Sequence, residues 1–123
     1  MHLVLRAFRE LARVQYLLWF RHLPAVYAYV TIPERERRGG ASRPPSEICG
    51  AVETACIWFF KDVSCLHRSA VTARLLKQYG VNAQMVIGAQ SLPFKAHAWV
   101  EVDGEVINDK PYVREMYPEL DRL

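Results

Sequence analysis

The sequence predicts an α+β fold in which helices come first and a small antiparallel sheet follows. Two observations favour this class: apolar residues recur at helical spacing before Gly80, and they follow the shorter period of strands after it. The chain has 123 residues, of which 51% are hydrophobic, which is enough for one core. We therefore expect one compact domain, with a helical segment and a basic loop over residues 1–45 and a core over residues 46–123.

The first predicted helix runs from Leu3 to Phe20. Its apolar positions recur every three or four residues: Leu3, Ala7, Leu11, Val14 and Leu18. A second short helical segment is expected after Pro24. We interpret the apolar face as packed on its own domain, and the alternative is a docking surface for a partner or a membrane. Arginines interrupt the stretch, so no uncharged span could cross a bilayer, and membrane contact is not favoured.

Two further helices are predicted between the charged, Gly- and Pro-rich segment 33–45 and Gly80. One begins at Ser46 and runs to about Phe60. The other begins at Cys65 after a cap at Asp62 or Ser64 and ends at about Tyr79, where Gly80 suits a helix stop.

Three strands are predicted after Gly80, over residues 83–89, 96–102 and 105–109, and the tail after Pro111 has no predicted structure. The last two strands form a hairpin, and its loop decides which residues share a face. A two-residue loop would place Asp109 opposite Ala98. A three-residue loop with a bulge at Gly104 would place it opposite His97, and we expect that loop.

Composition excludes several classes of protein. The net charge of +3 is too small for a nucleic-acid-binding surface, so no nucleic-acid partner is expected. The odd number of cysteines and the lack of a secretory signal argue against a disulfide framework and favour a cytoplasmic protein. No Cys-x-x-Cys motif occurs, so neither a metal nor a cofactor is expected.

Cys65 is the candidate nucleophile because it starts a predicted helix. Free N–H groups and the helix dipole stabilise a thiolate at that position. Cys49 and Cys56 lie inside the preceding helix and are expected to be small buried residues.

His97 is the candidate base among the four histidines. It lies near a strand start between two alanines, which leave its ring accessible, whereas His67 follows Cys65 on the same helix, points elsewhere and is expected at the surface. Asp109 ends the next strand, beside His97. Cys65, His97 and Asp109 would then act as nucleophile, base and orienting acceptor. The competing interpretation is a buried cysteine and an incidental strand histidine.

The stretch from Cys65 to Asp109 resembles the transglutaminase-like superfamily, and within it the protease domain of lasso-peptide maturation B proteins. The matching features are Cys65-Leu66 with Arg68, Gly80, Ile87-Gly88 and the segment AHAWVE at residues 96–101. The resemblance implies a papain/transglutaminase-like fold and maps the family's protease triad onto Cys65, His97 and Asp109. The implied activity is removal of the leader from a ribosomally made precursor through a thioester. The alternatives are a transglutaminase-type amide transferase and an inactive peptide-binding module.

The resemblance also implies partners. We expect no separate leader-recognition domain before Ser46, where there is little room for one, and the chain resembles the split form of the family. That form implies three partners: the precursor peptide, a separate small leader-recognition protein and an asparagine-synthetase-like cyclase. In the implied mechanism the Cys65 backbone N–H is one oxyanion donor, and Trp99 shares a strand face with His97 as a cleft or core residue.

Overall fold

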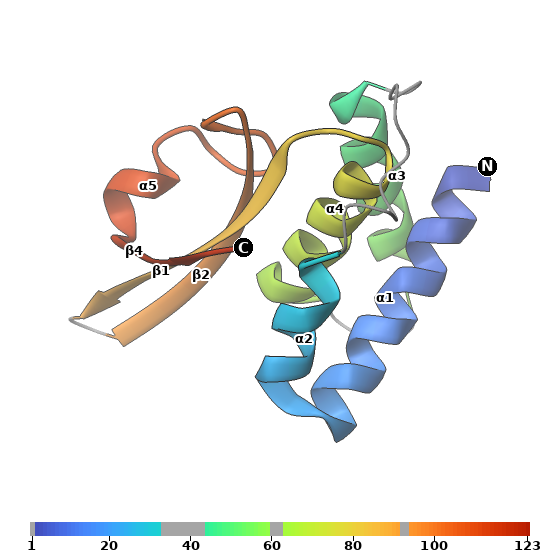
Figure 1. Cartoon of the computed structure of the whole chain (residues 1–123), viewed down its shortest axis with the longest axis horizontal. Coiled ribbons are helices and arrows are strands. Elements are labelled where there is room, and N and C mark those ends of the chain that lie inside the picture. The colour runs from blue at the N-terminus through green and yellow to red at the C-terminus, as the bar shows by residue number, and fades with distance from the viewer. Residues whose placement is uncertain (1, 33–43, 60–62, 92–93) are drawn as a thin grey trace.

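The computed structural model confirms the α+β class, with helices followed by an antiparallel sheet (Figure 1). It describes residues 2–32, 44–59, 63–91 and 94–123, so most of the expected loop lies outside the described residues. The elements are α1 His2–Phe20, α2 His22–Val30, α3 Pro45–Trp58, α4 Cys65–Gln78, β1 Ala83–Ser91, β2 Phe94–Val102, β3 Glu105–Val106, α5 Val113–Met116 and β4 Glu119–Arg122.

The apolar face of α1 packs within the domain, as expected. Leu3, Ala7, Leu11 and Val14 are buried in one core with residues of α3, α4 and the sheet. Within the ranges given above, no helix is long and apolar enough to cross a membrane.

Helix ends follow local chemistry. α3 begins at Pro45, one residue before the predicted Ser46, because proline suits the first helical turn, where its missing N–H is not needed. α4 begins at Cys65 with Ser64 as its cap, and Ser64 Oγ accepts the His67 backbone N–H at 3.3 Å. After α4, Gly80 adopts a φ of 83°, which a residue with a side chain rarely adopts.

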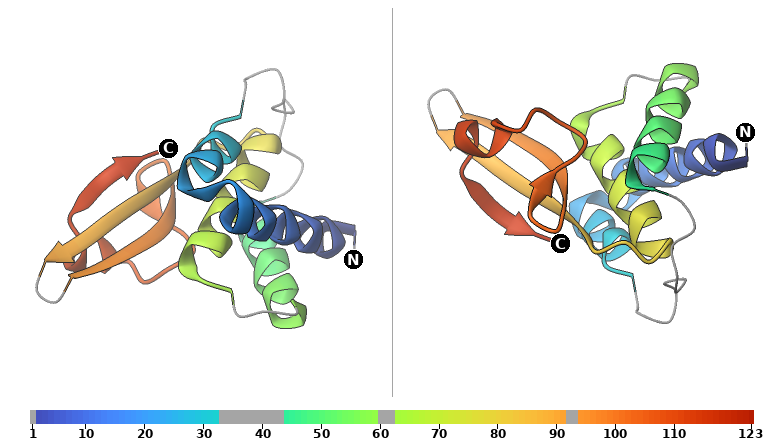
Figure 2. Two further views of the ribbon diagram at one scale, coloured as in Figure 1. Left: turned by 90° about the horizontal axis from the view of Figure 1, so that it is seen from below. Right: turned by 90° about the horizontal axis from the view of Figure 1, so that it is seen from above.

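The strands form one antiparallel sheet in the order β3-β2-β1-β4. α4 packs on one face, where Met85 and Val100 join the main core. On the other face, Val113 of α5 packs on Val86 and Trp99. Figure 2 shows the long helices gathered on one side of the molecule and the sheet with α5 on the other. α5 and β4 correct the prediction of an unstructured tail.

The β2–β3 loop differs from the prediction. Val102 pairs with Glu105, so the loop has two residues, and the expected three-residue loop is wrong. Asp103 and Gly104 have φ values of 51° and 83°, and a type I′ turn needs positive φ at both positions.

β3 also ends at Val106 rather than at Asp109. The Ile107 N–H still donates to the Val100 carbonyl at 3.0 Å, but the next contact comes from a side chain. Asn108 Oδ1 accepts the Val100 N–H at 2.7 Å, where a strand would offer a backbone carbonyl. The chain leaves the ladder there, so strand alternation no longer decides where Asp109 points.

Candidate active site

Cys65 is the first residue of α4 and is half-buried. The N–H of a first helical residue has no intrahelical carbonyl partner, so it can donate to a ligand. Cys65 borders a cavity of about 160 Å³ beside the start of β2. The cavity is lined by residues of α2, α4, β1 and β2: Tyr27, Cys65, Leu66, Ile87, Ala96, His97 and Ala98.

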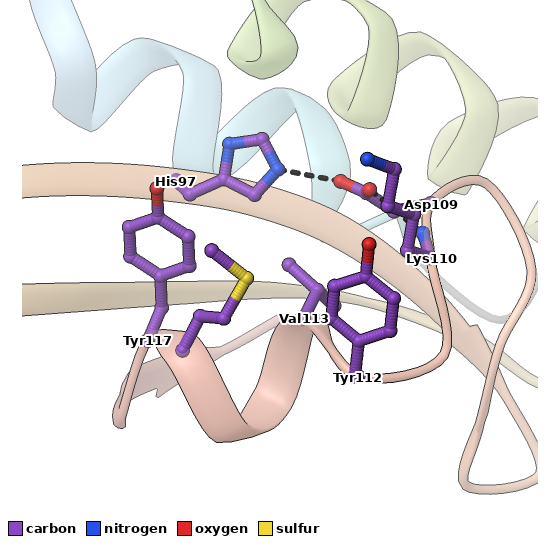
Figure 3. Close-up of a pocket in the computed structure, with 7 residues that line it drawn as sticks. His97, Asp109, Lys110, Tyr112, Val113 and Tyr117 are labelled. Atoms are coloured by element: carbon purple, nitrogen blue, oxygen red, sulfur yellow. Dashed lines mark hydrogen bonds and ion pairs between the residues drawn. The ribbon is translucent and has the colours of Figure 1, made fainter.

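His97 and Asp109 are hydrogen-bonded, with 2.5 Å between His97 Nε2 and Asp109 Oδ2 (Figure 3). An ionised carboxylate only accepts, so Nε2 carries the hydrogen, and in the neutral imidazole Nδ1 is the nitrogen with the free lone pair. Burial favours the neutral acid, but hydrogen bonds from His97 and from the Lys110 backbone N–H hold the pKa of Asp109 below its usual value. Asp109 is therefore an anion at neutral pH.

His97 connects two cavities. It lines the one that contains Cys65, and it also lines a second of about 190 Å³ with Asp109, Lys110 and Tyr117 (Figure 3). His97 thus lines the cavity that contains the candidate nucleophile, and its imidazole is hydrogen-bonded to the candidate orienting acid. Among the described residues no hydrogen bond joins Cys65 to His97, and such catalytic contacts often form only when substrate is bound.

The strand register decides which face of the sheet carries the His97 side chain. His97 shares a face with Trp99, opposite the face that α4 covers. β3 pairs only with Glu101 and Val102, so it does not cover the edge of β2 at His97. Trp99 itself is 1% exposed and donates to Glu101 Oε2 at 2.9 Å, which makes it a core residue rather than part of the cleft.

Asn108 and Ser69 support the site, although the sequence did not predict a role for either residue. Asn108 Nδ2 donates to Ser69 Oγ at 3.2 Å, and Ser69 Oγ donates to the Ala98 carbonyl at 3.0 Å. With its bond to Val100, Asn108 fastens the segment before Asp109 to both α4 and β2. One sequence signal could have predicted this: Asn and Asp have low strand propensity, so the Asn108-Asp109 pair favours an end of the strand before Asp109.

His67 is buried, which corrects its expected surface position. Its Nε2 donates to Gln15 Oε1 at 2.8 Å, and its Nδ1 lies 2.6 Å from Ser64 Oγ. Because both ring nitrogens have partners, His67 serves the start of α4 and is no base for Cys65.

The other two cysteines are half-buried rather than fully buried. Burial, with a contribution from Glu53, raises the pKa of Cys49 to about 11. Burial also raises the pKa of Cys56, although Arg68 opposes the change. Both thiols are therefore protonated at neutral pH and are poor nucleophiles.

Comparisons with known proteins find a matching family and a curated relative. A family model described as the transglutaminase-like superfamily matches residues 4–121. Among curated proteins, the microcin J25-processing protein McjB of Escherichia coli is 45% identical over 51 residues, which are 42% of this chain. The matched segment is only 24% of that protein's length. No solved structure matches.

Proposed function

This chain belongs to the transglutaminase-like superfamily, and from that premise we propose that it is a cysteine peptidase with Cys65 as nucleophile. His97 is the proposed base and Asp109 the proposed orienting acceptor. One observation carries the proposal: His97 lines the cavity that contains Cys65, and its imidazole is hydrogen-bonded to Asp109. A nucleophile, a base and an orienting group in this order are what acyl transfer through a thioester needs.

The proposed reaction begins with transfer of the Cys65 thiol proton to His97 Nδ1. The thiolate attacks the scissile carbonyl, and the Cys65 backbone N–H stabilises the developing oxyanion. The amine leaves with a proton from His97, which breaks the C–N bond and leaves the acyl group on Cys65 as a thioester. Water then attacks the thioester, so that the acid is released and the thiol is restored. Asp109 keeps the imidazole oriented throughout.

The proposed substrate is the precursor of a lasso peptide, cleaved between leader and core. The similarity to the microcin J25-processing protein supports this choice of substrate. We include as partners a separate small leader-recognition protein and an asparagine-synthetase-like cyclase that closes the ring. A recognition protein that binds both leader and peptidase would raise the effective concentration of the substrate without entering the chemistry.

Incubation with a precursor peptide, with and without a recognition protein, tests the proposal by mass. A peptidase yields free leader acid and free core, whereas an amide transferase in the presence of an added amine yields a leader–amine adduct. An inactive binding module leaves the precursor intact. We expect free leader acid and free core, formed at a higher rate with the recognition protein than without it. Either of the other results would overturn the peptidase assignment.

A further inference from the structure

Tyr117 lies against the ring of His97. The two ring centroids are 5.2 Å apart and the ring planes differ by 29°, which is a stacked arrangement. Figure 3 shows the Tyr117 ring beside His97, on the wall of the cavity that Asp109 also lines. Nothing in the chemistry described above uses Tyr117.

The backbone on both sides of Tyr117 is fixed. Its own N–H donates to the Val113 carbonyl at 3.1 Å, and the carbonyl of Pro118 accepts the Ala89 N–H at 3.0 Å. α5 therefore holds one side and β1 the other, so the aromatic ring has a defined place over the sheet.

Gly88 makes this close approach possible. It pairs with His97 across the β1–β2 ladder, so the two residues share a face. A Cβ at Gly88 would lie 2.6 Å from the Tyr117 carbonyl oxygen and 2.9 Å from both Tyr117 Cβ and a ring carbon of Trp99. These distances are too short for any side chain, so only glycine leaves room for Tyr117 at this point.

A single hydrogen bond does not fix an imidazole. The bond from Nε2 to Asp109 allows the ring to swing about the line that joins the two atoms, and His97 is 26% exposed. A ring stacked on the imidazole face removes that freedom. The orientation then retained has Nε2 on Asp109 and leaves Nδ1 free for the thiol.

We propose that Tyr117 is a positioning residue for His97, and that Gly88 is glycine so that Tyr117 can take this role. The proposal rests on the proposed function, in which His97 is the base. The aromatic ring is what matters, so phenylalanine should replace Tyr117 and leucine should not.

The test compares Tyr117→Leu with Tyr117→Phe in two ways that need no substrate. The first is the rate at which iodoacetamide alkylates Cys65, read by peptide mass mapping, because that rate follows the thiolate that His97 supports. The second is the NMR shift of the His97 ring protons, which a stacked ring displaces. Tyr117→Leu should slow alkylation and move these resonances, and Tyr117→Phe should change neither by much.

Cleavage kinetics add a third measurement. Tyr117→Leu should lower kcat by about 10- to 100-fold, the usual cost of misplacing a catalytic group. KM should stay within about twofold, because substrate binding is not touched. Gly88→Ala should behave like Tyr117→Leu. Gly50→Ala and Tyr16→Leu should behave as wild type, since a Cβ at Gly50 meets nothing within 4 Å and Tyr16 is exposed on α1.

A folded Tyr117→Leu protein with wild-type alkylation and unshifted His97 resonances would overturn the positioning role, whatever its kcat. If Tyr117→Phe fails like Tyr117→Leu, the role assigned to the aromatic ring is wrong. If wild type cleaves no precursor while alkylation and resonances respond as expected, the positioning role holds and the peptidase function fails.

Discussion

Asp109→Asn removes the charge that orients His97 while keeping the shape of the side chain. The carboxylate accepts from Nε2 at 2.5 Å, and a hydrogen bond to a charged group contributes about 1.5–3 kcal/mol. Each 1.4 kcal/mol corresponds to about a tenfold change in rate, so full loss predicts about a 10- to 150-fold fall in kcat. Because 25% of the Asp109 side chain is exposed, water replaces part of the interaction, and we expect about 10- to 50-fold.

The assay is steady-state cleavage of precursor peptide at pH 7, with the fold checked by circular dichroism. Asp103→Asn is the matched control, because it removes the same charge from the exposed β2–β3 turn, where asparagine readily adopts the positive φ of 51°. Its kcat should equal that of wild type. A folded Asp109→Asn protein with wild-type kcat would refute the orienting role of Asp109.

The same variant carries a prediction for acid unfolding. The folded-state pKa of Asp109 is lowered, so the stability it adds is fully present above its ordinary value of 3.8 and is lost as the pH falls through the lower folded pKa. The difference in free energy of unfolding between wild type and Asp109→Asn should therefore be constant near neutral pH and shrink below about pH 4. A difference that grows on acidification would contradict the assigned direction.

Other changes test the surroundings of the site. Asn108→Ala leaves the Val100 N–H without its partner, and denaturant titration should show a loss of about 1–3 kcal/mol together with a lower kcat. Glu10→Gln weakens a buried network, since the 1% exposed carboxylate accepts from Tyr29 and Arg13; unfolding should become easier by about 1–3 kcal/mol, with little change in kcat. Cys49→Ala and Cys56→Ala should retain cleavage, because both thiols are protonated at neutral pH.

Matched variants separate these effects from general damage. Asn82→Ala and Glu105→Gln alter exposed side chains and should keep wild-type stability within about 0.5 kcal/mol. Equal losses in Asn108→Ala and Asn82→Ala would argue against a specific role for Asn108. Unchanged stability in Glu10→Gln would mean that the network adds nothing to the fold, and loss of cleavage in a folded Cys49→Ala protein would implicate the wrong cysteine.

The helical half of the fold was predictable because its signals are local. The apolar spacing of α1, the Ser64 cap and the stop at Gly80 each depend on residues a few positions apart. The tail was not predictable for the opposite reason. α5 has four residues and β4 has four, and β4 exists because it pairs with β1, a contact between segments far apart in the chain.

The neighbourhood of His97 and Asp109 was predicted, but through a wrong hairpin register. With the two-residue loop, strand alternation would place Asp109 opposite Ala98 if the strand continued to Asp109. In the structure Asn108 ends the ladder with its side chain, and Asp109 reaches His97 from beyond the strand. A side chain that replaces a backbone partner leaves no periodic trace in a sequence. The role of Tyr117 could not be predicted from the sequence for a similar reason, because it depends on a tertiary contact over Gly88.

Intact-mass analysis of an acid-quenched reaction tests most directly whether Cys65 is the nucleophile. Wild-type protein mixed with precursor should carry the leader as a thioester, with a mass increase equal to the leader minus one water. Peptide mapping should place the adduct on the segment that contains Cys65. The Cys65→Ala protein, folded, should carry no adduct and cleave no precursor. An adduct on Cys49 or Cys56, or full cleavage by folded Cys65→Ala protein, would contradict the account.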